Sequence, residues 1–358
     1  MGSKQYKYLD FLKVMAMCFV CMYHFWHGSA RESSGILGFL QTYSYSILST
    51  CVPLFFAVNG ALLLNRESFD GKKHFQKLLT IFLQFIVWHG ITTVILGLQA
   101  GVAFTSWSKH QLLNVFLLLE TPTGVDLDHL WFVPILCGIY LLYPFIRSVF
   151  VQEHQEHGAR ISLVCLLAVV YFVCFFLQDA AIFKNVSPYL MYFNTDSLLV
   201  LNPFSFRIGT MLTYFLIGGF LHRYREQAGK IPAVVLVLMM LVGLLVSYGI
   251  VILKPGFDIV FGGYSSTGTL LCTVSLFLLV SRMEEKLPSE GAFHVAVKSV
   301  GRNTMTIYYT HWILGYLLLA FMGYGCFWNL LKTAVFVISG TLLAEMMKRI
   351  PLVKYLVH

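Results

Sequence analysis

Two ionisable side chains, Lys13 and His24, occur in the first apolar segment of the chain, residues 9–27. Eleven residues make almost three turns of an α-helix, so both side chains project from one face, about 16 Å apart along the axis. Asp10, three residues before Lys13, falls near the same stripe. Ionisable groups are costly in lipid and usually have a function there. Because an imidazole titrates near neutral pH, His24 can take a proton from a hydroxyl group, which predicts general-base chemistry.

A structural interpretation of these residues stays open. In a crowded helix bundle, His24 could simply be hydrogen bonded to a neighbouring helix, and Lys13 could form a buried ion pair with Asp10. Lys13 could also bind an anionic ligand, and the two roles are compatible. The functional interpretation is favoured because all three groups share one stripe.

A second basic group precedes the third apolar segment and consists of Lys72, Lys73, His74 and Lys77. Together with Lys13, these residues would suit a phosphorylated ligand that approaches from the same side of the membrane. Ordinary retention of lysines on the cytoplasmic side explains Lys72 and Lys73 equally well, but explains Lys77 less well, because Lys77 abuts the helix.

Two further segments carry polar groups. The second segment has Asn59 directly before Gly60 and after Pro53, residues that loosen a membrane helix and let backbones approach. In the ninth segment, Tyr308 and His311 share one helical face, with His311 in mid-membrane.

Three other candidates lie where segments are expected to reach the outer face. His129 and Trp131 open the fourth segment at the external surface, and Arg207 begins the sixth. The expected external loops, 101–128 and 179–205, are aromatic and carry few charges. This composition suits a sugar-like acceptor that stacks on aromatic rings, although an interfacial aromatic belt has the same composition.

The composition is that of a multi-spanning membrane protein. Of the 358 residues, 58% are apolar and 12% are charged, and the mean hydropathy is +0.73. Soluble domains carry about 25% charged residues. We therefore expect an all-α protein, a single bundle of about ten transmembrane helices that forms one domain over residues 1–358. The apolar segments lie near 9–27, 44–65, 78–100, 129–150, 160–178, 206–221, 232–253, 265–281, 303–322 and 327–347.

Most of the 25 lysines and arginines fall in alternate loops on one side of this plan. Cationic loops are retained in the cytoplasm, so both termini are predicted to be cytoplasmic. The net charge of +8 then reflects topology and anionic lipid headgroups, and no nucleic-acid partner is expected. Cys18 and Cys21 have the spacing of metal ligands, but no second pair follows, so we expect structural thiols and no metal.

Taken together and in order, these segments resemble the acyltransferase family 3 membrane proteins. The branch that they resemble best is the surface-polysaccharide O-acetyltransferases, such as the enterobacterial common antigen O-acetyltransferase. The first helix of the family carries an aspartate, a basic residue and, after ten residues, a histidine. Its other motifs are PLFF-x-x-SG, HLWF with a downstream YL-x-x-P, and IY-x-x-H. The matching residues here are Asp10, Lys13 and His24; Pro53–Gly60; His129–Phe132 with Tyr140–Pro144; and Ile307, Tyr308 and His311.

The chain departs from the family pattern at three positions. Asn59 replaces a serine, and Lys13 stands where arginine is common, which removes a planar bidentate donor for phosphate. The Arg-x-x-Arg of the third helix is half present, as Lys77 followed by Thr80.

The resemblance implies a cytoplasmic acyl-CoA donor, usually acetyl-CoA, and an acceptor hydroxyl on an envelope polysaccharide or lipid-linked glycan. No metal or prosthetic group is expected. The location that the resemblance implies is the bacterial inner (plasma) membrane. In this scheme His24 is the general base, assisted by Asp10, while His311, Tyr308 or Asn59 donates to the oxyanion. The CoA phosphates lie at Lys13, Lys77 and Lys73, and the residues at the acceptor entrance are His129, Trp131 and Arg207.

Other classes of protein remain open at this point. A secondary transporter or glycan exporter could use the Asp10–Lys13–His24 stripe as a proton or substrate path, but this leaves the lysine cluster and the other motifs unexplained. A sensory membrane protein without catalysis, or a haem-binding bundle with axial ligands from His24, His89 and His311, is less consistent with the motifs.

Overall fold

The computed structural model consists of helices joined by turns in the part of the chain that it describes. It describes residues 6–25, 44–102, 127–152, 157–183, 206–253, 263–318, 323, 326–351 and 353–357. Within these ranges there is no β-strand. The predicted all-α class is therefore confirmed for this part of the chain.

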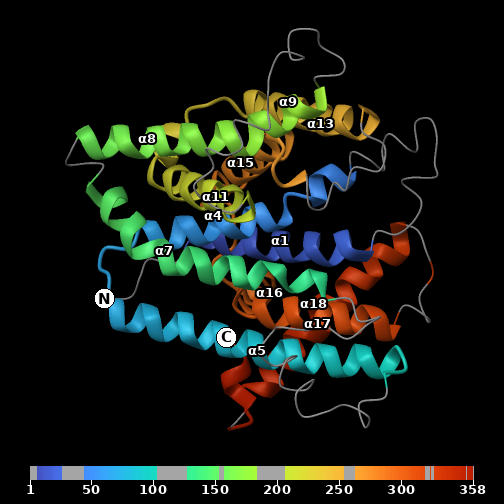
Figure 1. The fold of residues 1–358 in the computed structure, drawn as a ribbon. Coiled ribbons are helices and arrows are strands. Elements are labelled where there is room, and N and C mark those ends of the chain that lie inside the picture. Colours follow the sequence, from blue (N-terminus) through green and yellow to red (C-terminus); the bar gives the residue numbers. More distant parts are fainter. Residues whose placement is uncertain are drawn as a thin grey trace. The chain divides into compact units, whose positions relative to one another are not determined.

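Each of the ten apolar segments expected from the sequence contains a helix (Figure 1). The long helices are α1 (Lys7–Phe25), α4 (Cys51–Leu64), α5 (Gly71–Gln99), α7 (Phe132–Gln152), α8 (His157–Tyr171), α11 (Phe206–Arg223), α13 (Ala233–Leu253), α15 (Thr267–Ser281), α17 (Thr304–Leu318) and α18 (Cys326–Met347). Shorter elements are η2 (Asp128–Trp131), a π-helical turn η3 (Phe172–Phe176), α9 (Leu177–Phe183), α12 (Arg225–Ala228), α16 (Gly291–Arg302) and η5 (Val353–Leu356).

Five helices in the described ranges are long and apolar enough to cross a membrane: Ser44–Leu64, Gly71–Gln99, His129–Val151, Ala233–Ile250 and Phe327–Met347. Two shorter apolar helices cover Arg160–Phe176 and Thr267–Ser281. A membrane span needs about 20 predominantly apolar residues. The structure thus supports a multi-spanning membrane protein, while ten spans and cytoplasmic termini stay predictions.

The chain forms two compact units, and each is described by itself. Unit 1 consists of Met1–Ser68 and Leu142–Val297, and unit 2 of Phe69–Leu141 and Lys298–His358. Each unit therefore combines segments that are far apart in the sequence.

In unit 1, α4 and α11 pack with their backbones in contact (Figure 1). A Cβ atom on Gly60 would lie 1.7 Å from the carbonyl oxygen of Phe215, and one on Gly218 would lie 1.9 Å from that of Ala57. Only glycine fits at both positions. The prediction that the Pro53–Gly60 segment lets helices approach closely is confirmed, because close packing of small residues is how helices associate in lipid.

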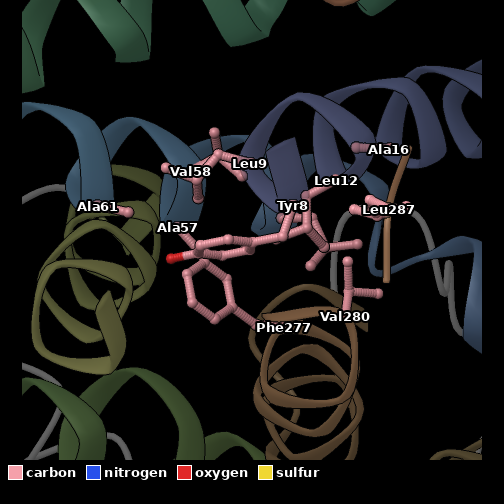
Figure 2. Packing of buried hydrophobic residues seen from close by; sticks show 11 residues of the cluster. Tyr8, Leu9, Leu12, Ala16, Ala57, Val58, Ala61, Phe277, Val280 and Leu287 are labelled. Atoms are coloured by element: carbon pink, nitrogen blue, oxygen red, sulfur yellow. The ribbon is translucent and has the colours of Figure 1, made fainter. Parts of the chain in front are cut away.

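The N-terminal half of α1 packs against α4 and α15 in the same unit. Its contacts form a buried apolar cluster that includes Leu9, Leu12, Ala57 and Phe277. Figure 2 shows the ring of Tyr8 between Ala57 and Phe277, whose ring is edge-on to that of Tyr8. This packing sets the rotation of α1 and therefore the direction of its polar stripe.

A carboxylate from a distant segment caps the start of α1. Glu284, after α15, accepts hydrogen bonds from the backbone N–H groups of Lys7 (3.3 Å) and Tyr8 (2.9 Å). The first N–H groups of a helix have no partner within it, and a negative charge there is stabilised by the helix dipole. The hydroxyl of Tyr8 is hydrogen bonded to Nδ1 of His222 on α11. The position of α1 is thus defined at its first turn.

In unit 2, α17 and α18 pack together and are joined by a polar network. The side-chain amide of buried Asn303 donates to Glu345 (2.7 Å), and Lys348 donates both to Asn303 (2.7 Å) and to Glu345 (2.9 Å). On the other side of α17, the ring of Tyr309 stacks on that of Trp88 in α5. These contacts position α17, which carries Tyr308 and His311.

Candidate active site

The predicted polar stripe is present on α1 in unit 1. Nζ of Lys13 lies 3.0 Å from Oδ1 of Asp10, and the two side chains are 23% and 15% exposed. His24 follows near the last turn of α1 and is half-buried. None of the three side chains is openly exposed. The local ion pair that the sequence left open is therefore formed.

Three apolar side chains occupy the face of α1 between Lys13 and His24. Met17, Val20 and Cys21 lie on this side of the helix and are buried. Apolar side chains, and no further charged group, therefore lie between Lys13 and His24 on this face of α1.

Aromatic rings of unit 1 surround the His24 end of α1. The ring of Tyr23 is edge-on to that of His24, with 5.6 Å between the centroids, and it stacks on Tyr45 at 4.6 Å. Such rings provide an apolar wall beside the imidazole and limit the directions from which a reactant can approach it.

Asn59 directs one amide hydrogen into its own helix. Its Nδ2 donates to the carbonyl oxygen of Phe55 at 2.9 Å, one turn earlier in α4. Asparagine carries two amide hydrogens, so this bond occupies one of them. The donor role predicted for Asn59 is therefore restricted to the second hydrogen.

A second candidate group lies in unit 2, where η2 and α17 meet. The ring of His129 stacks on the indole of Trp312 at 4.8 Å, and it lies edge-on to the ring of His311 at 5.8 Å. His129 is 3% exposed and His311 is fully buried. Because Trp312 and His311 cover its ring, the His129 side chain belongs to the interior of this group, and its position at the external side of the membrane stays a prediction.

Two hydrogen bonds define the proton positions in this group. Tyr308 donates its hydroxyl hydrogen to the carbonyl oxygen of His129. Nδ1 of His311 lies 2.6 Å from the carbonyl oxygen of Tyr308. A carbonyl oxygen only accepts, so Nδ1 carries the proton and Nε2 of the neutral ring carries the lone pair.

This arrangement bears on the roles predicted from the sequence. In its neutral form the His311 ring has a lone pair on Nε2 and can accept a proton there, whereas in its charged form the same nitrogen donates one. The hydroxyl hydrogen of Tyr308 is already directed at His129. The geometry thus shows that the Tyr308 hydroxyl joins α17 to η2, while the catalytic roles of Tyr308 and His311 stay predictions.

The lysines in the first two turns of α5 differ in their surroundings. Lys73 pairs with Asp70 at 3.4 Å, and its side chain is 83% exposed. Nζ of Lys77 lies 5.9 Å from the centre of the Tyr140 ring, within reach of a cation–π contact. An exposed pair such as Lys73–Asp70 contributes little to stability, so Lys73 can turn to a ligand at small cost.

The other predicted acceptor residues are placed only in part. Trp131 ends η2 and is half-buried. Arg207 is the second residue of α11, and its side chain lies outside the described part of the chain, as do the side chains of most of the loops 101–128 and 179–205.

Sequence reasoning missed Trp312 as a partner of His129. The signal was present in the dipeptide His311–Trp312, but two residues adjacent in a helix point in different directions. Only the position of η2 against α17 shows that the His129 ring contacts both.

Comparison with known proteins agrees with these observations. A family model for an acyltransferase domain (Acyl_transf_3) matches residues 6–357, nearly the whole chain. The chain belongs to this family. No curated protein and no solved structure matches it.

The family match covers both units, from α1 to η5. Together with the apolar helices it identifies a membrane acyltransferase. The two histidines described above, His24 and His311, both lie within the matched residues.

Proposed function

We propose that the protein transfers an acetyl group from cytoplasmic acetyl-CoA to a hydroxyl group of an envelope glycan on the outer side of a bacterial inner membrane. The observation that carries the proposal is the arrangement of α1. This helix carries the Asp10–Lys13 pair near its start and His24, half-buried among aromatic rings, near its end.

In this proposal Lys13 binds a phosphate of the CoA donor. The Asp10 carboxylate holds the lysine ammonium 3.0 Å away and so directs it. When a phosphate arrives, the ammonium can contact both anions, because it carries three hydrogens. In unit 2, Lys77 and Lys73 form a second group whose positive charge raises the local concentration of an anionic donor.

His24 acts as the general base on the acceptor hydroxyl. As the hydroxyl oxygen forms its bond to the thioester carbonyl carbon, its proton passes to the imidazole, and CoA leaves as the thiolate, which takes up a proton. The half-buried ring of Tyr45, which stacks on the buried ring of Tyr23, suits a sugar, whose apolar ring face packs on aromatic side chains. His311 is a second group able to accept a proton, in unit 2.

The experiment is transfer of radiolabelled acetyl groups from acetyl-CoA to envelope glycan in membranes that contain the protein. Replacing His24 by Ala is expected to abolish transfer with normal expression. A matched control is His294→Ala, which removes a histidine of α16 that none of these roles uses. Wild-type transfer by His24→Ala would remove His24 from the chemistry.

The acceptor is identified by a separate measurement. Mass spectrometry of envelope glycans from cells with and without the gene should show the loss of an acetyl mass from one glycan. A loss of a longer acyl mass would replace acetyl-CoA by another acyl-CoA as the donor.

A further inference from the structure

Unit 2 contains an open apolar cavity of about 360 Å³ between α5 and α7. Its walls are Phe75, Leu78, Leu79 and Phe82 of α5 and Cys137, Gly138 and Leu141 of α7. The four α5 residues are spaced so that they form one stripe of the helix. The volume lies within the range of about 300–1,000 Å³ that is usual for small-molecule sites. We name this cavity the α5–α7 groove.

The α5–α7 groove opens on the surface of two helices that can cross a membrane. Its rim residues Leu79 and Leu141 are 56% and 57% exposed, although both are apolar. The helices lie within the candidate spans Gly71–Gln99 and His129–Val151. An apolar rim on two such helices suits hydrocarbon, and a groove that opens there favours a flexible apolar chain over a polar solute.

A positive charge stands at the N-terminal end of the groove. Lys72 is exposed, and it precedes Phe75 by three residues and Leu79 by seven, which places it on the same stripe of α5. Of its neighbours, Lys77 lies against Tyr140, and Lys73 forms an exposed pair with Asp70. A lysine at a helix end extends its ammonium group to the level of the lipid headgroups.

We propose that the α5–α7 groove binds one acyl chain of an anionic phospholipid, whose phosphate lies at Lys72. The groove and the lysine together match an amphiphile with a negative head and an apolar tail. A free phosphate would leave the groove empty, and a lipid of zero net charge would gain little from Lys72. Basic sites at the cytoplasmic ends of membrane helices bind anionic headgroups in the same way.

The test is native mass spectrometry of the purified full chain in detergent, with phosphatidylglycerol and phosphatidylcholine of identical acyl chains added in equal amounts. Phosphatidylglycerol is expected to be retained about fivefold more, the ratio that corresponds to about 1 kcal/mol for one lysine at a membrane surface. Equal retention of the two lipids would overturn the assignment of the phosphate to Lys72.

Matched variants test the site of the lipid headgroup and the site of the acyl chain separately. Leu79→Gln should lower retention of both lipids, whereas Leu83→Gln should not, because Leu83 is also exposed (52%) on α5 but does not line the groove. Leu79→Ala and Leu83→Ala repeat the comparison without a polar group, in case the glutamine variants fold poorly. Equal effects at positions 79 and 83 would overturn the groove as the site of the chain.

Lys72→Gln should remove the preference for phosphatidylglycerol and leave retention of phosphatidylcholine unchanged. The control is Lys230→Gln, which removes another exposed lysine, in unit 1. A competition with acetyl-CoA distinguishes the two sources of phosphate. Displacement of phosphatidylglycerol by acetyl-CoA would assign Lys72 to the donor and overturn the proposal.

Discussion

Asp10 holds the ammonium group of Lys13 at 3.0 Å on the same face of α1. An i, i+3 pair of this kind needs no contribution from another helix. Because both side chains are partly exposed, the pair contributes modestly to stability. Its importance lies in keeping a positive charge at a defined point of a membrane helix.

Replacing Lys13 by Ala should raise the KM for acetyl-CoA about tenfold, the effect of losing about 1.4 kcal/mol of binding to an anionic donor. Lys13→Arg should keep the charge and bind the donor as well as the wild type or better, because guanidinium contacts phosphate through two hydrogens. The KM of each variant is measured from initial rates at a series of acetyl-CoA concentrations. An unchanged KM in Lys13→Ala would assign the lysine to the ion pair alone.

His311→Gln should lower kcat by about 10²–10⁴ if the Nε2 lone pair accepts a proton during the reaction. Tyr308→Phe, by comparison, removes the hydroxyl that donates to His129 and should lower stability by about 1 kcal/mol while retaining most activity. The measurements are kcat and thermal unfolding on the same preparations. If both variants lost activity and stability in equal proportion, His311 would have a structural role only.

Gly218→Ala should strongly destabilise unit 1. The added Cβ would lie 1.9 Å from the carbonyl oxygen of Ala57, and the backbones of α4 and α11 would have to separate. The expected loss is about 3 kcal/mol or more. Gly158→Ala is the control, since no atom lies within 4 Å of the added Cβ there. Thermal unfolding in detergent compares the two, and equal midpoints would contradict the close approach of α4 and α11.

His222 should make stability depend on pH in the acidic range. It follows the expected span 206–221, and burial, with the nearby positive charge of Arg225, lowers its pKa from 6.5 to about 4. The unfolded chain therefore binds a proton between these values and the folded chain does not. Stability is complete above pH 6.5 and falls as the pH is lowered towards 4.

The measurement is the unfolding midpoint from pH 7.5 to 4.5 for the wild type and for His222→Asn, which has no imidazole to protonate. The wild type should lose more stability than the variant over this interval. The rings of Tyr8 and Tyr6 also contact His222, and burial raises the pKa of Tyr8 further above this interval. Parallel curves would show that other groups set the pH dependence.

The helices and the polar stripe of α1 were predictable from the sequence. Long apolar runs form helices in lipid because every backbone hydrogen bond must then be made within the segment. The spacing of Asp10, Lys13 and His24 places them on one face through the helical period alone. The two glycines, Gly60 and Gly218, can be read from the sequence. The helix that each of them contacts cannot.

The group around His311 was decided by tertiary structure. His129 lies far from His311 in the sequence, and only the packing of η2 on α17 places its ring against His311 and Trp312. The direction of the Tyr308 hydroxyl, towards the carbonyl oxygen of His129, depends on the same packing. A helical period determines which face a side chain is on, but the atom that it meets belongs to another element, whose position no local pattern encodes.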